Sequence, residues 1–295
     1  MSKSVARPLD SLRPGQNWVL GPIPDYLLIV IAPVLGLLWA IGTFYLFGKG
    51  TSGQLAVIGI FMIFNVAHHF PTFIRIYGDA DLMKRFRWSL LLAPILPFTA
   101  SVLLCSFLVL RGFPIHYIIY LTIILTIWDP WHFLMQHYGF MRIYDRHNKA
   151  PQKLAAWMDY SVSWAWFIFM LVAAAEWFVD VLYRLQIHHG LPLLLWLDTD
   201  AYYLARGLTL AVAVLVSFAY AGYLIWCWSR GYFVSWAKLC MLSILFGVMY
   251  LGYVPNGLTQ SLFPDWTFGL GFATTGMVHV SQYLAIVWKY NRSLA

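Results

Sequence analysis

Five histidines lie within long apolar stretches of this chain, at His68, His69, His132, His137 and His279. An ionisable side chain inside a membrane is costly, so it is usually retained for a function or beside a polar partner. Imidazole nitrogens bind metal ions and haem iron, and they also form hydrogen bonds between helices. The five histidines therefore predict a metal or haem site, with interhelical hydrogen bonding as the alternative for any one of them.

The densest group of polar residues is in the sequence IWDPWHFLMQHY. Asp129 and His132 are three residues apart, so a helix places them on one face, which Gln136 continues. His132 and His137 are separated by about 140° around a helix. Pro130 predicts a kink or bulge here, because it lacks an N–H group and clashes with the preceding turn. Such a bulge could turn both imidazoles towards one centre; the alternative is that His137 faces a neighbouring helix.

Two other stretches carry the remaining histidines. His68 and His69 diverge by about 100° on a helix, so they could flank one centre, serve two metals, or leave one as the partner of a ligand. His279 shares a helix face with Thr275 and Gln282. The amide side chains that we expect to contact a bound cofactor are those of Asn65, Gln136 and Gln282.

Three more polar residues accompany these histidines. Asp129 is expected to bind the metal or to orient His132, and we assign it to the catalytic group together with Tyr138. Tyr138 could take part in electron transfer or hydrogen bonding, with core packing as the alternative. Asp159 is a candidate carboxylate ligand or histidine partner, and capping of a helix at the membrane interface is the alternative. The predicted metal ligands are thus His68, His69, His132, His137, His279 and Asp159.

The composition of the chain places these residues in a membrane protein. Hydrophobic residues make up 61% of the 295 residues and charged residues only 11%, and the mean hydropathy is +0.70. A soluble domain has about 25% charged residues, so this chain could not cover a surface in water. The composition excludes a disordered chain, a disulfide scaffold and a soluble nucleic-acid-binding protein. The lipid bilayer is the expected partner, and no nucleic acid is expected.

Eight apolar runs are long enough to cross a membrane as helices, for which about 20 residues suffice. Their continuous apolar character, without alternation of period two, favours helices over a β-barrel. The predicted fold is all-α, a polytopic integral-membrane bundle, with residues 1–25 as a cytoplasmic N-terminal segment and 26–295 as one transmembrane domain. The predicted spans are 26–48, 54–76, 88–110, 115–144, 156–183, 201–228, 235–254 and 266–290.

The basic residues indicate how these spans are oriented. With a cytoplasmic N-terminus, 15 of the 19 Lys and Arg residues fall on the cytoplasmic side, as the positive-inside rule requires. Both termini are therefore predicted to be cytoplasmic, in a bacterial inner membrane. At 1.5 Å per residue, His68, His69 and His279 then lie about 20 Å, and His132 and His137 about 26–33 Å, from the outer side. Histidines from three separate helices are thus expected at similar depths.

Two of the histidine stretches resemble known motifs. His132-Phe-Leu-Met-Gln-His137 fits the HX3–4H box of integral-membrane fatty-acid desaturases and hydroxylases, and Asn65-Val-Ala-His68-His69 is similar to their (H/Q)xxHH box, with Asn in the first place. That family binds two irons at the cytoplasmic side of its helices. Here the boxes are out of the family's order and cover only short stretches, and His279-x-x-Gln282 is a degraded match. The dispersed histidines also resemble those of bacterial carotene dioxygenases. The resemblance implies a metal-dependent membrane oxygenase and names no substrate.

Imidazole and carboxylate ligands without thiolate favour non-haem iron, manganese, copper or zinc over an iron–sulfur centre. We therefore predict a metal-dependent oxidoreductase that acts on an apolar small molecule dissolved in the bilayer, with iron, alone or as a di-iron pair, as its cofactor. An electron-donor protein or other membrane subunits are the expected protein partners. The alternatives are a b-type haem electron-transfer protein, in which two histidines hold each haem, and a transporter lined by His and Asp.

Overall fold

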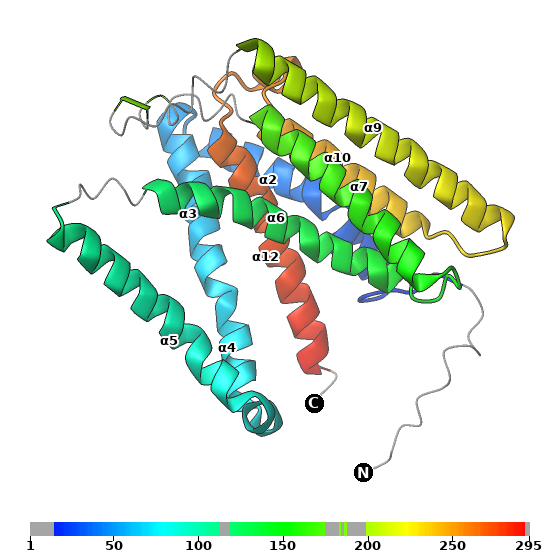
Figure 1. The fold of residues 1–295 in the computed structure, drawn as a ribbon, viewed down its shortest axis with the longest axis horizontal. Coiled ribbons are helices and arrows are strands. Elements are labelled where there is room, and N and C mark those ends of the chain that lie inside the picture. Colours follow the sequence, from blue (N-terminus) through cyan, green and yellow to red (C-terminus); the bar gives the residue numbers. More distant parts are fainter. Residues whose placement is uncertain (1–14, 113–118, 175–182, 184–185, 188–198, 293–295) are drawn as a thin grey trace.

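Every regular element in the described part of the chain is a helix, which confirms the all-α fold class. The computed structural model describes residues 15–112, 119–174, 183, 186–187 and 199–292 (Figure 1). In chain order the elements are α1 (Pro22–Asp25), the π-helical turn η2 (Tyr26–Val30), α2 (Ala32–Leu46), α3 (Gly50–Ala67), α4 (His69–Gly78), α5 (Ala80–Leu110), α6 (Ile119–Tyr144), α7 (Gln152–Ala173), α9 (Thr199–Ser229), α10 (Trp236–Tyr253), α11 (Gly257–Leu262) and α12 (Phe268–Arg292).

Six helical stretches in the described residues are long and apolar enough to cross a membrane. A seventh results if α1, η2 and α2 are counted as one span with a bend of 48°. These stretches support an integral membrane protein, because each is close to or above the length that a bilayer requires. The six are Gly50–Gly78, Ala80–Leu110, Gln152–Ala173, Thr199–Ser229, Trp236–Tyr253 and Phe268–Lys289.

The sequence predicts eight spans, one more than the seven just counted, and the missing span corresponds to α6. This helix occupies most of the predicted 115–144 span, but it is not among the stretches that are apolar enough. The physical reason is its composition, since Asp129, His132, Gln136 and Arg142 interrupt its apolar residues. The helix that carries more of the candidate site residues than any other is therefore not among the candidate spans by hydropathy alone.

Helix α12 lies in the middle of the described bundle. It packs against α2, α3, α6 and α10, and Figure 1 shows it running between α3–α4 and the α6, α7 and α10 side. Two of its glycines permit this close packing. A Cβ atom on Gly271 would lie 2.0 Å from the carbonyl oxygen of Gly252 in α10, and one on Gly276 would lie 2.2 Å from the ring of Phe61 in α3. These glycines therefore serve helix contact.

Helix α5 contrasts with α12, because it lies at the edge of the bundle (Figure 1). It packs mainly against α4 and contains no buried residue, although it is 31 residues long. In a membrane most of its surface would face lipid. The space between α5 and the rest of the bundle is where the candidate site lies.

The segment before α1 packs across the helix ends at one side of the bundle. Asn17 Nδ2 donates to the carbonyl oxygen of Ile143 at 2.9 Å, and Ser235 Oγ donates to Gln16 at 2.7 Å. Lys289 Nζ donates to the carbonyl oxygen of Val19 at 2.5 Å. Residues 15–25 therefore belong to the packing of the helical domain, whereas 1–14 of the predicted N-terminal segment lie outside the described residues.

Candidate functional site: a histidine-lined cavity

A cavity of about 580 Å³ lies between α4 and α5 on one side and α6 and α12 on the other. One wall is polar and holds four of the five predicted histidines with an amide and a tyrosine. The opposite wall is mostly apolar and comes from α5 and from the part of α4 that follows His69. The polar wall consists of His68, His69, His132, Gln136, His279 and Tyr283; the other lining residues are Phe73, Ile76, Tyr77, Leu90, Ala93 and Pro94.

His68 lies at a break in the predicted 54–76 helix, between α3 and α4. The sequence explains the break, because Pro71 has no N–H group to donate to the carbonyl of Ala67, four residues earlier. The helix is interrupted at His68 and begins again at His69. The two imidazole centroids are 4.0 Å apart, and His69 Nδ1 is 2.9 Å from the carbonyl oxygen of Asn65. The break thus places both rings on the cavity wall.

The imidazoles of three separate helical segments meet at His279. Its ring centroid lies 5.4 Å from that of His68 and 4.9 Å from that of His132. Phe133 stacks against the other side of His279 at 4.8 Å, and the ring of Tyr283 is 5.3 Å from His68. The proximity expected from the predicted depths is therefore present for His68, His69, His132 and His279.

These separations can be compared with those of a metal site. Two imidazoles that hold one ion at about 2 Å from their nitrogens have centroids roughly 4.5–5 Å apart. The observed distances come close to this, but the rings of His68 and His132 meet that of His279 edge to face, with interplanar angles of 90° and 62°. In the described part of the chain, no three His, Cys, Asp or Glu side chains are already arranged to hold a metal ion.

Two imidazole nitrogens in this group lack hydrogen bonds. His279 is 4% exposed and its Nδ1 atom is buried, without a hydrogen-bond partner among the described residues. Nδ1 of His68 is also buried; it lies near the carbonyl groups of Phe64 and Asn65 but outside hydrogen-bonding geometry. A buried polar atom without a partner is unusual in a native fold and often indicates a ligand, an ion or water.

His137 differs from the other four histidines, because the protein occupies both of its nitrogens. Its Nδ1 donates to the carbonyl oxygen of Phe133 at 2.9 Å, so Nε2 can accept from Gln282 Nε2 at 3.1 Å. The Gln282 side chain also accepts from Gln136 Nε2 at 3.0 Å and donates to the carbonyl oxygen of Ile29 at 3.2 Å. His137 and Gln282 are fully buried and do not line the cavity. The hydrogen bond to Gln282 joins His137 of α6 to α12. His137 thus faces a neighbouring helix, which is the alternative that the sequence left open for it.

The structure places Asp159 in a buried ion-pair cluster and not beside the histidines. Its carboxylate lies 2.6 Å from Arg142 and 3.1 Å from Lys238, and it accepts a hydrogen bond from the Tyr220 hydroxyl at 2.8 Å. Asp145 is 2.5 Å from Lys238 and 3.4 Å from Arg142. The predicted metal-ligand role has no support from this geometry, because cations and a hydroxyl already satisfy the carboxylate.

Sequence reasoning missed this cluster as a unit. Lys238 served only as an orientation marker, yet it is 1% exposed, and Asp145 is fully buried. Burial raises the pKa of Asp145, and the ammonium of Lys238 acts in the opposite direction. The available signal was a lysine inside the apolar run 235–254, because a buried lysine requires an acidic partner.

The other predicted residues, Asp129, Tyr138 and Asn65, do not line the cavity. Asp129 is half-buried in α6 and is within electrostatic range of His132. The ring of Tyr138 contacts Tyr160 of α7 at 5.7 Å and does not line the cavity. Asn65 contributes its backbone carbonyl to His69. The residues that sequence reasoning missed are those of the α4–α5 wall, which no histidine pattern could identify.

The chain was also compared with known proteins. The comparisons found no family model, no curated protein and no solved structure that matches it.

Proposed function

We propose that this chain is an integral membrane, metal-dependent oxidoreductase whose substrate is an apolar molecule that enters the histidine-lined cavity from the bilayer. The observation that carries the proposal is the convergence of His68, His132 and His279 on the polar wall of a cavity of about 580 Å³. Buried Nδ1 atoms without partners at His68 and His279 add to it. In this proposal, modest rotation of the three rings directs their nitrogens at one ion.

Imidazole ligands suit several transition metals, and among them we propose iron, because the proposed oxidation requires a metal that changes its oxidation state. The iron would supply activation of dioxygen, which serves as the oxidant for the apolar substrate. If one oxygen atom leaves as water, two electrons and two protons must come from outside, so an electron-donor protein is the proposed partner. Of the chain's own residues, the cavity walls hold the substrate and exclude water, and Gln136 and Tyr283 provide polar contacts near the ion.

The spacing of the histidines supports a non-haem ion over haem b. Two imidazoles on opposite faces of a haem, each with its nitrogen about 2 Å from the iron, have centroids roughly 6–6.5 Å apart. The pairs His68–His279 and His132–His279 are closer, at 5.4 and 4.9 Å. A macrocycle between either pair would require the helices to separate, whereas a single ion would not.

We further propose that α6 also crosses the membrane, with both termini cytoplasmic. Eight spans and the distribution of 15 of 19 basic residues favour this orientation. Single cysteines introduced in 145–153 should react only with a reagent that reaches the cytoplasmic side. Labelling of that segment from outside would overturn the orientation.

Metal analysis of purified protein tests the central proposal. His68→Ala, His132→Ala and His279→Ala should each lose most of the bound iron, since each removes one of three ligands. His147→Ala is the matched control, because His147 lies in the loop after α6 and outside the cavity. Wild-type iron content in all three cavity variants, or a strong Soret band in the absorption spectrum, would contradict the proposal.

A further inference from the structure

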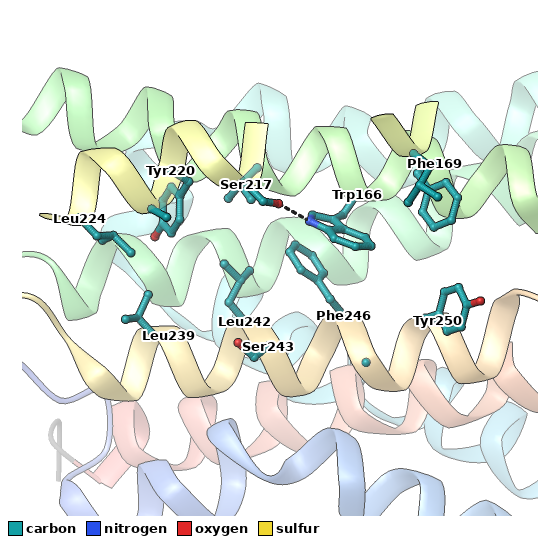
Figure 2. Close-up of a pocket in the computed structure, with 14 residues that line it drawn as sticks. Trp166, Phe169, Ser217, Tyr220, Leu224, Leu239, Leu242, Ser243, Phe246 and Tyr250 are labelled. Atoms are coloured by element: carbon teal, nitrogen blue, oxygen red, sulfur yellow. Dashed lines mark hydrogen bonds between the residues drawn. The ribbon is translucent and has the colours of Figure 1, made fainter. Parts of the chain in front are cut away.

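A second cavity, of about 630 Å³, lies between α9 and α10 with α7 as its floor. It shares no lining residue with the histidine-lined cavity, so it is independent of the proposed function. Figure 2 shows it as a groove along the helices, from Leu224 and Leu239 at one end to Phe169 and Tyr250 at the other. Its three helices are all candidate membrane spans, so the groove lies at the depth of the lipid.

Three of the polar side chains in the groove wall, those of Trp166, Ser217 and Tyr220, already form hydrogen bonds within the protein. Trp166 Nε1 donates to Ser217 Oγ at 3.0 Å, as Figure 2 shows, and Ser217 donates in turn to the carbonyl oxygen of Ala213 at 2.7 Å. The Tyr220 hydroxyl donates to Asp159. Trp166 stacks on Phe246 at 5.7 Å and forms a rigid aromatic wall. The groove therefore offers hydrocarbon surface to its occupant and few free polar groups.

The groove follows α10 from Leu239 to Tyr250, and the helix rises about 16 Å over these residues.

The ends of the groove match one leaflet of a bilayer. Trp228 and Trp236, which are 78% and 71% exposed, flank the turn between α9 and α10, and exposed tryptophans mark the membrane interface. The groove begins at Leu239, three residues beyond Trp236, and its length is close to the leaflet's hydrocarbon thickness of about 15 Å. Arg230 is exposed at the same turn, where an anionic headgroup would meet a cation.

We propose that this groove binds the acyl chains of an anionic phospholipid, with its phosphate beside Arg230. The lipid fills the gap that α9 and α10 leave between them above α7. The site is distinct from the substrate cavity, so the protein would hold a resident lipid as well as an apolar substrate.

Photo-crosslinking in reconstituted vesicles tests this site. The probe is a phosphatidylglycerol with a diazirine in mid-chain, at trace level in phosphatidylcholine vesicles. Labelling of α9 and α10 groove residues should exceed labelling of the exposed face of α5 at least fivefold. Equal labelling of both surfaces would overturn the site. An unlabelled groove would indicate that a second copy of the chain covers it and would overturn the lipid assignment. Equal labelling of the groove by a phosphatidylcholine probe with the same diazirine would overturn the assignment of an anionic headgroup.

A pair of glycines provides matched variants. Gly247 lines the groove and Gly222 does not, and a Cβ atom at either meets open space. Gly247→Leu should fill the groove and reduce crosslinking threefold or more, whereas Gly222→Leu should leave it unchanged. Both variants should fold, because the first side-chain atom added at either position meets open space. Equal crosslinking in the two variants would overturn the proposal.

Discussion

The molecule contains two groups of ionisable side chains, and they differ in how far the protein satisfies them. In the ion-pair cluster of Arg142, Asp145, Asp159 and Lys238, each carboxylate has a cation within 3.4 Å, and among its carboxylate oxygens only Asp145 Oδ1 is buried without a hydrogen bond among the described residues. The histidine cavity instead has two such imidazole nitrogens beside a space of about 580 Å³. A satisfied buried cluster supports the fold, whereas unsatisfied groups at an open cavity are available to a ligand.

Removing a charge from the ion-pair cluster should have the largest effect on stability. Lys238→Met leaves Asp145 and Asp159 buried with Arg142 as their remaining cation, and breaking a buried pair in this way costs about 3–5 kcal/mol. The melting temperature in detergent should fall strongly, while the iron content of the folded fraction stays unchanged.

Lys289→Met is the control for this variant. Its ammonium donates to the carbonyl oxygen of Val19 at an exposed position, so its loss should lower the melting temperature only slightly. A Lys238→Met protein as stable as wild type would show that the cluster does not hold the helix ends together. Loss of bound iron from Lys238→Met without a change in melting temperature would instead show that the ion-pair cluster contributes to the histidine site.

The histidines also differ in how far the protein satisfies them, and His137 of α6 can be compared with His279 of α12. His137→Ala should destabilise the protein by about 1–3 kcal/mol, because Gln282 loses its acceptor in a buried position. The iron content should stay at the wild-type level. His279→Ala should do the reverse, with most of the iron lost and a smaller change in melting temperature. Iron loss in His137→Ala would place His137 among the ligands.

The sequence predicted the helical class, the approximate spans and the meeting of four histidines, because apolar run length and helical rise determine these features. It could not separate His137 from His132, since the distinction depends on Gln282, 145 residues away in the chain. The ion pairs of Asp159 could not be foreseen for the same reason: Arg142 and Lys238 approach it only after α6, α7 and α10 have packed. The apolar wall from α5 depends on where an exposed helix rests, and no local pattern encodes that position.

Asp129 shares features with both groups, because it is a carboxylate like those of the ion-pair cluster but lies near a histidine of the cavity. Its variant is expected to have the smallest effect on stability. Its carboxylate is half-buried on α6, three residues before His132 and within electrostatic range of it. The ring of Trp128 lies almost parallel to that of His132, with the two centroids 6.4 Å apart. A carboxylate that orients a ligating imidazole also increases its basicity. Asp129→Asn keeps the shape and removes the charge, so metal affinity should fall about 10–100-fold with little change in melting temperature. Asp265→Asn, at an exposed loop position, is the matched control and should bind metal as wild type does. If Asp129→Asn also binds metal as wild type does, Asp129 belongs with the structural carboxylates and His132 is oriented by packing alone.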